Sequence, residues 1–251
     1  MVNDKNDRRV GRRMLAVYKE KDAEINTRAE AIGSKCGRGC ADCCNLTVTI
    51  TFPEAVAIAE HILTNPEFYL QQNQIHTELA EQIRVHLEGF KQRNPRYYFD
   101  QKIPCVFLDK STKECRVYDV RPATCRSHHV ATDPTLCSSD NKDQPVGRID
   151  MDKINNYMNL EALRVSKQAN LPLWIGPLQI MVSWAFKLLR EGRESVANAH
   201  IGLSDGDIMN LNFWRLRPPT QTTVEIPIET LNLSFTHSDT TDGRTPGEGD
   251  H

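Results

Sequence analysis

The sequence GSKCGRGCADCC, residues 33–44, places four cysteines within nine positions of the chain. The stretch also contains three glycines, and their conformational freedom lets the backbone turn tightly enough for several sulfur atoms to converge. Thiolates are soft ligands that suit zinc, Cu(I) or iron–sulfur clusters. The stretch therefore predicts a metal site whose ligands include Cys36, Cys40, Cys43 and Cys44.

A second set of cysteines follows at wider intervals, at Cys105, Cys115, Cys125 and Cys137. The spacing is too wide for a single metal knuckle, but a hairpin could bring Cys105 and Cys115 beside Cys125. Spacing alone leaves three arrangements open: two separate sites, one mixed site with spare cysteines, or one cluster together with a zinc ion. All eight cysteines are candidate metal ligands.

Charged and imidazole side chains surround Cys125 in the sequence. Arg121 and Arg126 flank it, and their guanidinium groups would offset the negative charge of a thiolate-bound metal or cluster, which makes them candidate cofactor-binding residues. Arg121 has the alternative of pairing with a neighbouring surface carboxylate. His128 and His129 could complete a metal site or act as ordinary hydrogen-bonded histidines.

The composition limits the class of protein. The chain has 251 residues and a formal net charge of −2, without the basic excess of a general nucleic-acid binder. The most apolar stretch, 171–189, is broken by prolines and polar residues, and the N-terminal residues lack an apolar segment, so we expect neither a membrane span nor a secretory signal. We therefore expect a cytoplasmic protein, in which clustered cysteines bind metal or take part in redox chemistry more often than they form disulfides. A protein partner is compatible with this composition.

Hydrophobic periodicity and capping signals predict a mainly α fold with a small β-hairpin. Thr51 and Glu54 form a capping-box pattern that opens a helix running to about Leu63, after a short strand within 45–51. The hairpin is expected at 104–119, followed by a short helix whose first residue is Pro122. Longer helices are expected over the first 32 residues and over 74–93, 150–169 and 176–191. The last of these is apolar almost all round, which favours a buried core helix over a partner-binding surface.

These patterns divide the chain into four expected segments. They are an N-terminal charged helix (1–33), a cysteine-cluster metal-chelating domain (34–138), a C-terminal helical segment (139–233) and a disordered tail (234–251).

The spacing Cys36-x3-Cys40-x2-Cys43 also occurs in radical S-adenosylmethionine enzymes. In those enzymes an aromatic residue precedes the last cysteine, where this chain has Asp42, and a long series of βα units surrounds the cluster. Because this chain is mainly helical, that reading is disfavoured. The glycines at 33, 37 and 39 do not form the GxGxxG pattern of a dinucleotide site.

Three motifs follow one another along the chain: CxxxCxxCC at 36–44, PCxFL at 104–108 and CxVYxxRPxxCR at 115–126. Their order resembles the YkgJ-like cysteine-cluster family, described as a zinc- or iron-chelating domain, over about residues 34–138. That family includes the bacterial flagellin lysine N-methylase. The resemblance implies a metal or iron–sulfur centre in a bacterial cytoplasmic protein. In the methylase the centre resembles a [4Fe–4S] cluster.

The residues and the resemblance together give three hypotheses. The first is a cytoplasmic metal-binding protein that holds an iron–sulfur cluster, [4Fe–4S] in type, through both cysteine blocks. The second is a structural zinc module, whose metal orders loops that could not bury enough surface unaided. The third is an iron–sulfur-dependent protein lysine N-methyltransferase, and only this reading requires S-adenosylmethionine.

Overall fold

A computed structural model describes residues 8–94, 97–138 and 146–192. Seven α-helices and a two-stranded antiparallel sheet form the regular structure of this part of the chain. The predicted mainly α fold with a small β element is thus confirmed. The expected tail at 234–251, and residues 193–233 of the expected C-terminal segment, lie outside the described residues.

Helix α2 (Phe52–Thr64) lies at the centre of the fold, because it packs against α1 (Arg8–Ala31) on one side and α7 (Leu178–Glu191) on another. Almost every side chain in its first two turns is buried. Small residues there, Ala55, Ala57 and Ala59, let the neighbouring helices approach closely, since interaxial distance depends on the side chains at the contact.

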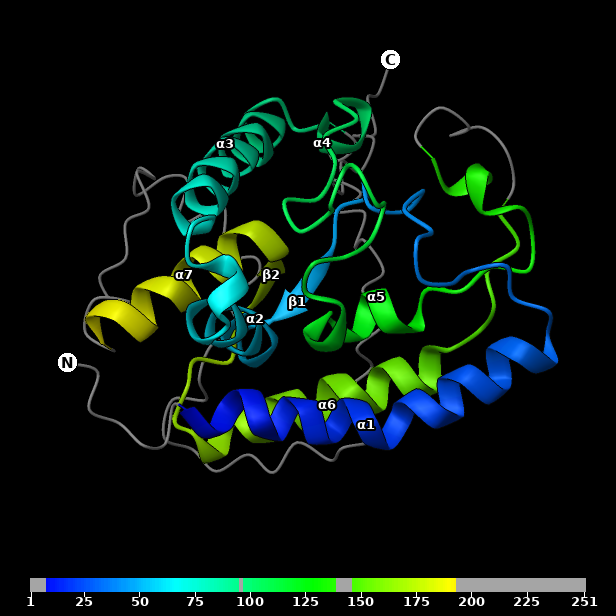
Figure 1. The fold of residues 1–251 in the computed structure, drawn as a ribbon, viewed down its shortest axis with the longest axis horizontal. Helices are drawn as coiled ribbons and strands as arrows, with labels where there is room; N and C mark the ends of the chain where they lie inside the picture. Colours follow the sequence, from blue (N-terminus) through cyan, green and yellow to red (C-terminus); the bar gives the residue numbers. More distant parts are fainter. Residues whose placement is uncertain (1–7, 95–96, 139–145, 193–251) are drawn as a thin grey trace, which may run out of the picture. The chain divides into compact units, whose positions relative to one another are not determined.

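The remaining long helices cover this centre. Helix α6 (Asp152–Gln168) runs beside α1, and α3 (Gln72–Lys91) runs beside α7 (Figure 1). One core cluster takes buried side chains from all of these helices. The prediction that 176–191 forms a buried core helix is confirmed, because α2 and α3 both pack against α7 and Gly192 closes it with a positive φ of 93°.

The sheet joins two segments that are far apart in the chain. Strand β1 (Thr49–Thr51) pairs antiparallel with β2 (Ile175–Pro177), with Ile50 opposite Gly176. Each strand runs directly into a helix, β1 into α2 and β2 into α7. A Cβ on Gly176 would lie 3.0 Å from the Met181 side chain, so glycine permits this close approach. The short strand predicted within 45–51 is confirmed, and its partner strand precedes α7.

The expected hairpin at 104–119 is reduced to a single antiparallel bridge between Leu108 and Cys115. The turn between them is closed by the backbone amides of Ser111 and Thr112, which donate hydrogen bonds to the Asp109 carboxylate. After Cys115 the chain enters a 3-10 helix, η2 (Tyr118–Val120), which ends the strand pairing.

Shorter helices complete the connections. Helix α5 (Ala123–Ser127) begins one residue later than predicted, because Pro122 is extended, with ψ of 159°, and acts as the N-cap. The structure adds the 3-10 helices η1 (Pro66–Phe68) and η3 (Pro134–Cys137) and the short helix α4 (Tyr97–Asp100), none of which the sequence pattern indicated. Within the described ranges, no helix has the length and apolar character needed to cross a membrane.

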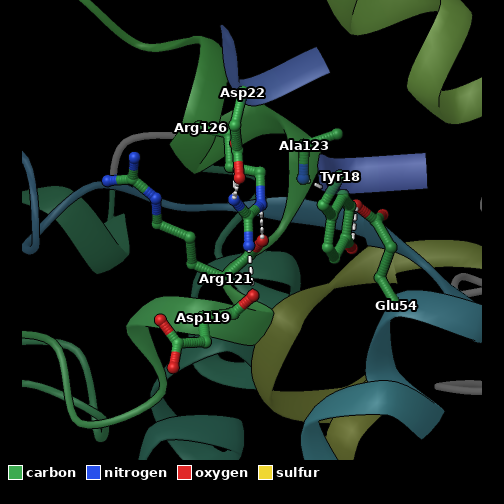
Figure 2. A network of polar contacts seen from close by, with 7 residues as sticks. All are labelled: Tyr18, Asp22, Glu54, Asp119, Arg121, Ala123 and Arg126. Carbon is green, nitrogen blue, oxygen red and sulfur yellow. Dashed lines mark hydrogen bonds and ion pairs between the residues drawn. The ribbon is translucent and has the colours of Figure 1, made fainter. Parts of the chain in front are cut away.

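The predicted capping box at Thr51 and Glu54 is present, and the Glu54 carboxylate also accepts hydrogen bonds from residues outside the cap. Glu54 is only 1% exposed. Its carboxylate accepts hydrogen bonds from the Thr51 amide (2.8 Å) and hydroxyl (2.9 Å), the Tyr18 hydroxyl (3.2 Å) and the Ala123 amide (2.7 Å) (Figure 2). One side chain therefore connects α1, the start of α2 and the start of α5.

Replacing this carboxylate should destabilise the protein strongly. Glu54→Ala leaves buried donors unsatisfied, and we expect the free energy of unfolding to fall by about 3 kcal/mol or more. Urea denaturation at equal metal loading measures this. Glu67→Ala, which removes an exposed carboxylate just beyond α2, is the matched control and should change stability by less than about 0.5 kcal/mol. Equal losses in the two variants would contradict the role assigned to Glu54.

Candidate metal centre

The segment Arg121–Arg126 positions one of the predicted thiols. The fixed φ of Pro122, −62°, leads the extended chain into α5, and the first free amide of α5, that of Ala123, is taken by Glu54. Cys125 therefore lies on a short helix whose start is fixed by a buried hydrogen bond. Its thiol is close enough to Tyr18 and Glu54 for electrostatic interaction with both.

Arg126 is a structural connection between α5 and α1. Its Nη1 donates to both carboxylate oxygens of Asp22, at 2.7 and 2.8 Å, and its Nε and Nη2 donate to the backbone carbonyls of Arg121 (2.9 Å) and Asp119, respectively (Figure 2). It also lies 4.2 Å from the centroid of the Tyr18 ring. With the Arg126 side chain almost fully buried, these contacts compensate its desolvation. The guanidinium predicted to bind the cofactor is thus engaged mainly with protein groups.

Arg121 points away from this network (Figure 2). Its guanidinium lies 4.1 Å from the centroid of the Tyr118 ring, and its Nε is buried without a hydrogen-bond partner in the described structure. The positive charge of Arg121 acts to lower the pKa of the Cys115 and Cys125 thiols. Of the two predicted arginines, Arg121 therefore has the freer guanidinium beside the thiols.

Four cysteines drawn from both blocks form one group, which we name the inner thiols: Cys43, Cys105, Cys115 and Cys125. Burial raises the pKa of Cys105 and Cys125, and the nearby thiols of Cys115 and Cys43 add to these two shifts, respectively. Burial also raises the pKa of Cys115, whereas a hydrogen bond with the Cys44 thiol is the main cause of the raised pKa of Cys43.

The backbone holds the two cysteine blocks together. The amide of Cys105 donates to the carbonyl of Cys44 at 2.7 Å, so the loop 33–44 and the loop before the Leu108–Cys115 bridge are in direct contact. The Cys105 and Cys115 side chains also pack against the hydrophobic core. The sequence left open whether the blocks share a site, and the structure brings cysteines of both together.

Three further cysteines form a second group, the outer thiols: Cys36, Cys40 and Cys137. Burial raises the pKa of Cys137 to about 11, with further contributions from the thiols of Cys43, Cys36 and Cys40. Cys40 Sγ lies 3.7 Å from an Asp42 carboxylate oxygen, and Cys36 Sγ accepts from the Val130 amide at 3.3 Å. Cys43, next to Cys44, interacts with both groups. All eight cysteines are unpaired.

The two histidines differ in their surroundings. His128 Nε2 lies 3.8 Å from Cys137 Sγ, whereas His129 Nδ1 contacts the Ser34 hydroxyl at 3.0 Å. Burial is the main cause of a lowered pKa for both imidazoles, so both are largely neutral at pH 7. A neutral imidazole is the form that binds a metal ion.

A buried polar cluster, which no sequence pattern indicates, adjoins Cys105. The Gln82 amide donates to the carbonyl of Pro104 at 2.9 Å, and its oxygen accepts from Tyr98 (2.9 Å) and Gln179 (3.1 Å). Gln179 in turn contacts His86 Nε2 at 3.0 Å. These side chains come from α3, α4 and α7. The hydrophobic periodicity of the sequence predicts the apolar positions of these helices but not the contacts among their polar residues. The cluster fixes the residue that precedes Cys105.

Comparison with known proteins agrees with a cysteine-rich, metal-chelating domain. Residues 35–159 match the model of the family described as "Putative zinc- or iron-chelating domain". The match covers all eight cysteines and extends into α6, and it supports metal binding at the level of zinc or iron. No curated protein and no solved structure matches the chain. Among the described side chains, no set of three or more His, Cys, Asp or Glu residues is arranged to hold a metal ion.

Arg126→Lys tests the structural role of the buried guanidinium. Lysine keeps the charge, but its single nitrogen cannot contact Asp22 and the carbonyls of Arg121 and Asp119 together, so we expect the free energy of unfolding to fall by about 2 kcal/mol or more. Chemical denaturation measures the change. Arg164→Lys, in the exposed pair with Glu161, is the matched control, with an expected loss below about 1 kcal/mol. A wild-type stability for Arg126→Lys would refute this role.

Proposed function

We propose that this protein binds an iron–sulfur cluster through the inner thiols Cys43, Cys105, Cys115 and Cys125. The observation that carries the proposal is the grouping of thiols from two cysteine blocks, held by the hydrogen bond from the Cys105 amide to the Cys44 carbonyl. Cysteine thiolates are the usual ligands of such clusters, four for each cluster. The family match supports the coarser conclusion that the chain chelates zinc or iron.

The arrangement of the inner thiols favours a cluster over a structural zinc ion. Structural zinc sites usually take their ligands from closely spaced Cys-x2–4-Cys pairs. The inner thiols instead come from the loop at Cys43, the two sides of a bridge and α5. Arg121 supplies a positive charge beside this set, which offsets the negative charge of a cluster bound by four thiolates.

The residues around the inner thiols would hold the cluster and limit its contact with water. A bound iron–sulfur cluster supplies one-electron redox chemistry, and its potential responds to nearby hydrogen bonds and solvent exposure. The packing of Cys105 and Cys115 against the core reduces that exposure. Eight unpaired thiols also fit the reducing cytoplasm, where we place the protein. Among the described residues, no feature favours the methyltransferase hypothesis over metal binding alone.

Cys125→Ser tests the proposed cluster. Serine has nearly the size of cysteine but is a poor ligand for iron, so we expect anaerobically purified protein to lose most of its iron, its acid-labile sulfide and its broad absorption near 400 nm. Ser127→Ala, on the same short helix, is the control and should retain all three. A colourless wild-type protein without iron and sulfide, or full retention of both by Cys125→Ser, would exclude the proposal.

Metal binding should become tighter as the pH rises. The pKa values of Cys105, Cys115 and Cys125 are raised, so in apoprotein these thiols are protonated between pH 6 and 8 and must release protons to bind metal. With Co²⁺ as a probe, we expect the apparent affinity to increase about tenfold per pH unit for each proton released. Titration followed by thiolate-to-cobalt absorption measures it. An affinity that is independent of pH would contradict protonated thiols as the ligands.

A further inference from the structure

We propose that a cavity beside Arg126, which we name the Arg126 cavity, binds a small zwitterion: a free α-amino acid with an apolar side chain. The cavity has a volume of about 320 Å³ and is lined by residues of α1, α2, η2 and α5. This volume is toward the lower end of the range for small-molecule sites, so it suits a compact ligand. Among the residues that line it there is no cysteine, and its occupant would bind without a metal.

A buried guanidinium provides a fixed hydrogen-bond donor in the Arg126 cavity. Arg126, which is 3% exposed, lines the cavity and is held by Asp22 and two backbone carbonyls. Its Nη2 carries two N–H groups, and in the described structure this nitrogen has one acceptor, the Asp119 carbonyl. The second N–H is therefore available to a carboxylate that enters the cavity.

Two exposed groups of opposite charge line the same cavity without pairing. The Lys19 ammonium comes from α1 and the Asp119 carboxylate from η2, and neither forms an ion pair within the part of the chain that the structure describes. Figure 2 shows the Asp119 carboxylate turned away from the Arg126 guanidinium, which contacts the Asp119 backbone instead. A ligand that carries both an ammonium and a carboxylate can contact Lys19 and Asp119 at once.

The charges that line the cavity balance, and this favours a zwitterion over a simple anion or amine. Lys19 and Arg126 are positive, and Asp22 and Asp119 are negative. The ligand carboxylate would accept from Lys19 Nζ and Arg126 Nη2, and its ammonium would donate to Asp119 and Asp22. The Asp22 side chain is 38% exposed, and its oxygens keep lone pairs beyond those used by Arg126 Nη1. A ligand with one charge would leave a partly desolvated charge uncompensated.

The other lining residues add apolar surface without adding charge. Burial lowers the pKa of His61, so its imidazole is largely neutral at pH 7. Leu15 and Val120 line the cavity together with the aromatic rings of Tyr18 and Tyr118. These side chains favour a ligand whose own side chain is apolar, because its burial among them removes apolar surface from water.

Calorimetric titration of the intact protein with L-leucine, L-methionine and L-phenylalanine tests the site. We expect at least one of them to bind saturably, with one molecule per chain. The amine and the carboxylic acid that lack one of the two charges, isoamylamine and isocaproate in the case of leucine, should bind at least about tenfold more weakly. Each has lost the charged group that contacts one pair of side chains.

Substitution of the two unpaired groups locates the binding. Lys19→Gln and Asp119→Asn should each weaken binding about tenfold, because each removes one charged contact to the ligand. The matched controls are Asp152→Asn and Lys153→Gln, which remove the same charges at exposed positions of α6 outside the cavity and should bind as the wild type does. All four side chains are exposed, so we expect unchanged circular dichroism in every variant.

Three results would overturn the amino-acid site. They are the absence of saturable binding for all three amino acids, equal binding of the amine or the carboxylic acid, and wild-type affinity in either Lys19→Gln or Asp119→Asn. The iron and sulfide content of the same samples decides the proposed cluster independently, so failure of one site is distinguishable from failure of the other.

Discussion

The buried carboxylate of Glu54 is the constraint on which the arrangement around the cysteines depends. A buried charge is costly unless hydrogen bonds replace its hydration, and here Tyr18, Thr51 and Ala123 provide the donors. Because these residues belong to three different elements, the position of α5 is fixed relative to α1 and α2. Tyr18 also presents its ring face to Arg126, so the carboxylate contacts the hydroxyl and the guanidinium contacts the ring of one aromatic side chain. Because Cys125 lies on α5, these contacts also determine where its thiol lies.

The two groups of thiols differ in how firmly the protein holds them. Of the inner thiols, Cys125 lies on α5 and Cys105 and Cys115 pack against the core, with Cys115 in a β-bridge, whereas the outer thiols lie on a glycine-containing turn and at the end of a 3-10 helix. Side chains on rigid elements favour ligands of fixed size and geometry, and loops adapt more easily to the ion that they meet. Cys43, which interacts with both groups, lies where they meet.

Local sequence signals predicted much of the fold. The capping box at Thr51 and the periodicity of 74–93 and 176–191 specify α2, α3 and α7, because capping and amphipathicity act within a few residues. The pairing of Ile50 with Gly176 was not predictable, since strands of three residues carry almost no pattern. The expected hairpin at 104–119 extends to only one bridge because the chain enters η2 directly after it. The grouping of the cysteines, and the contact of Arg126 with Asp22, depend on tertiary packing that spacing along the chain does not encode.

The pairing of β1 with β2 bears on whether the cysteine-rich segment can fold without the rest of the chain. The family match ends at residue 159, before β2 and α7, and it begins after α1. Yet α2, which lies inside the match, is covered by α1 and α7, and the strand that leads into it pairs with Ile175. Excised at those limits, the segment would expose the apolar faces of its own central helix. The cysteine-rich segment of this chain therefore depends for its folding on helices that lie outside it in the sequence.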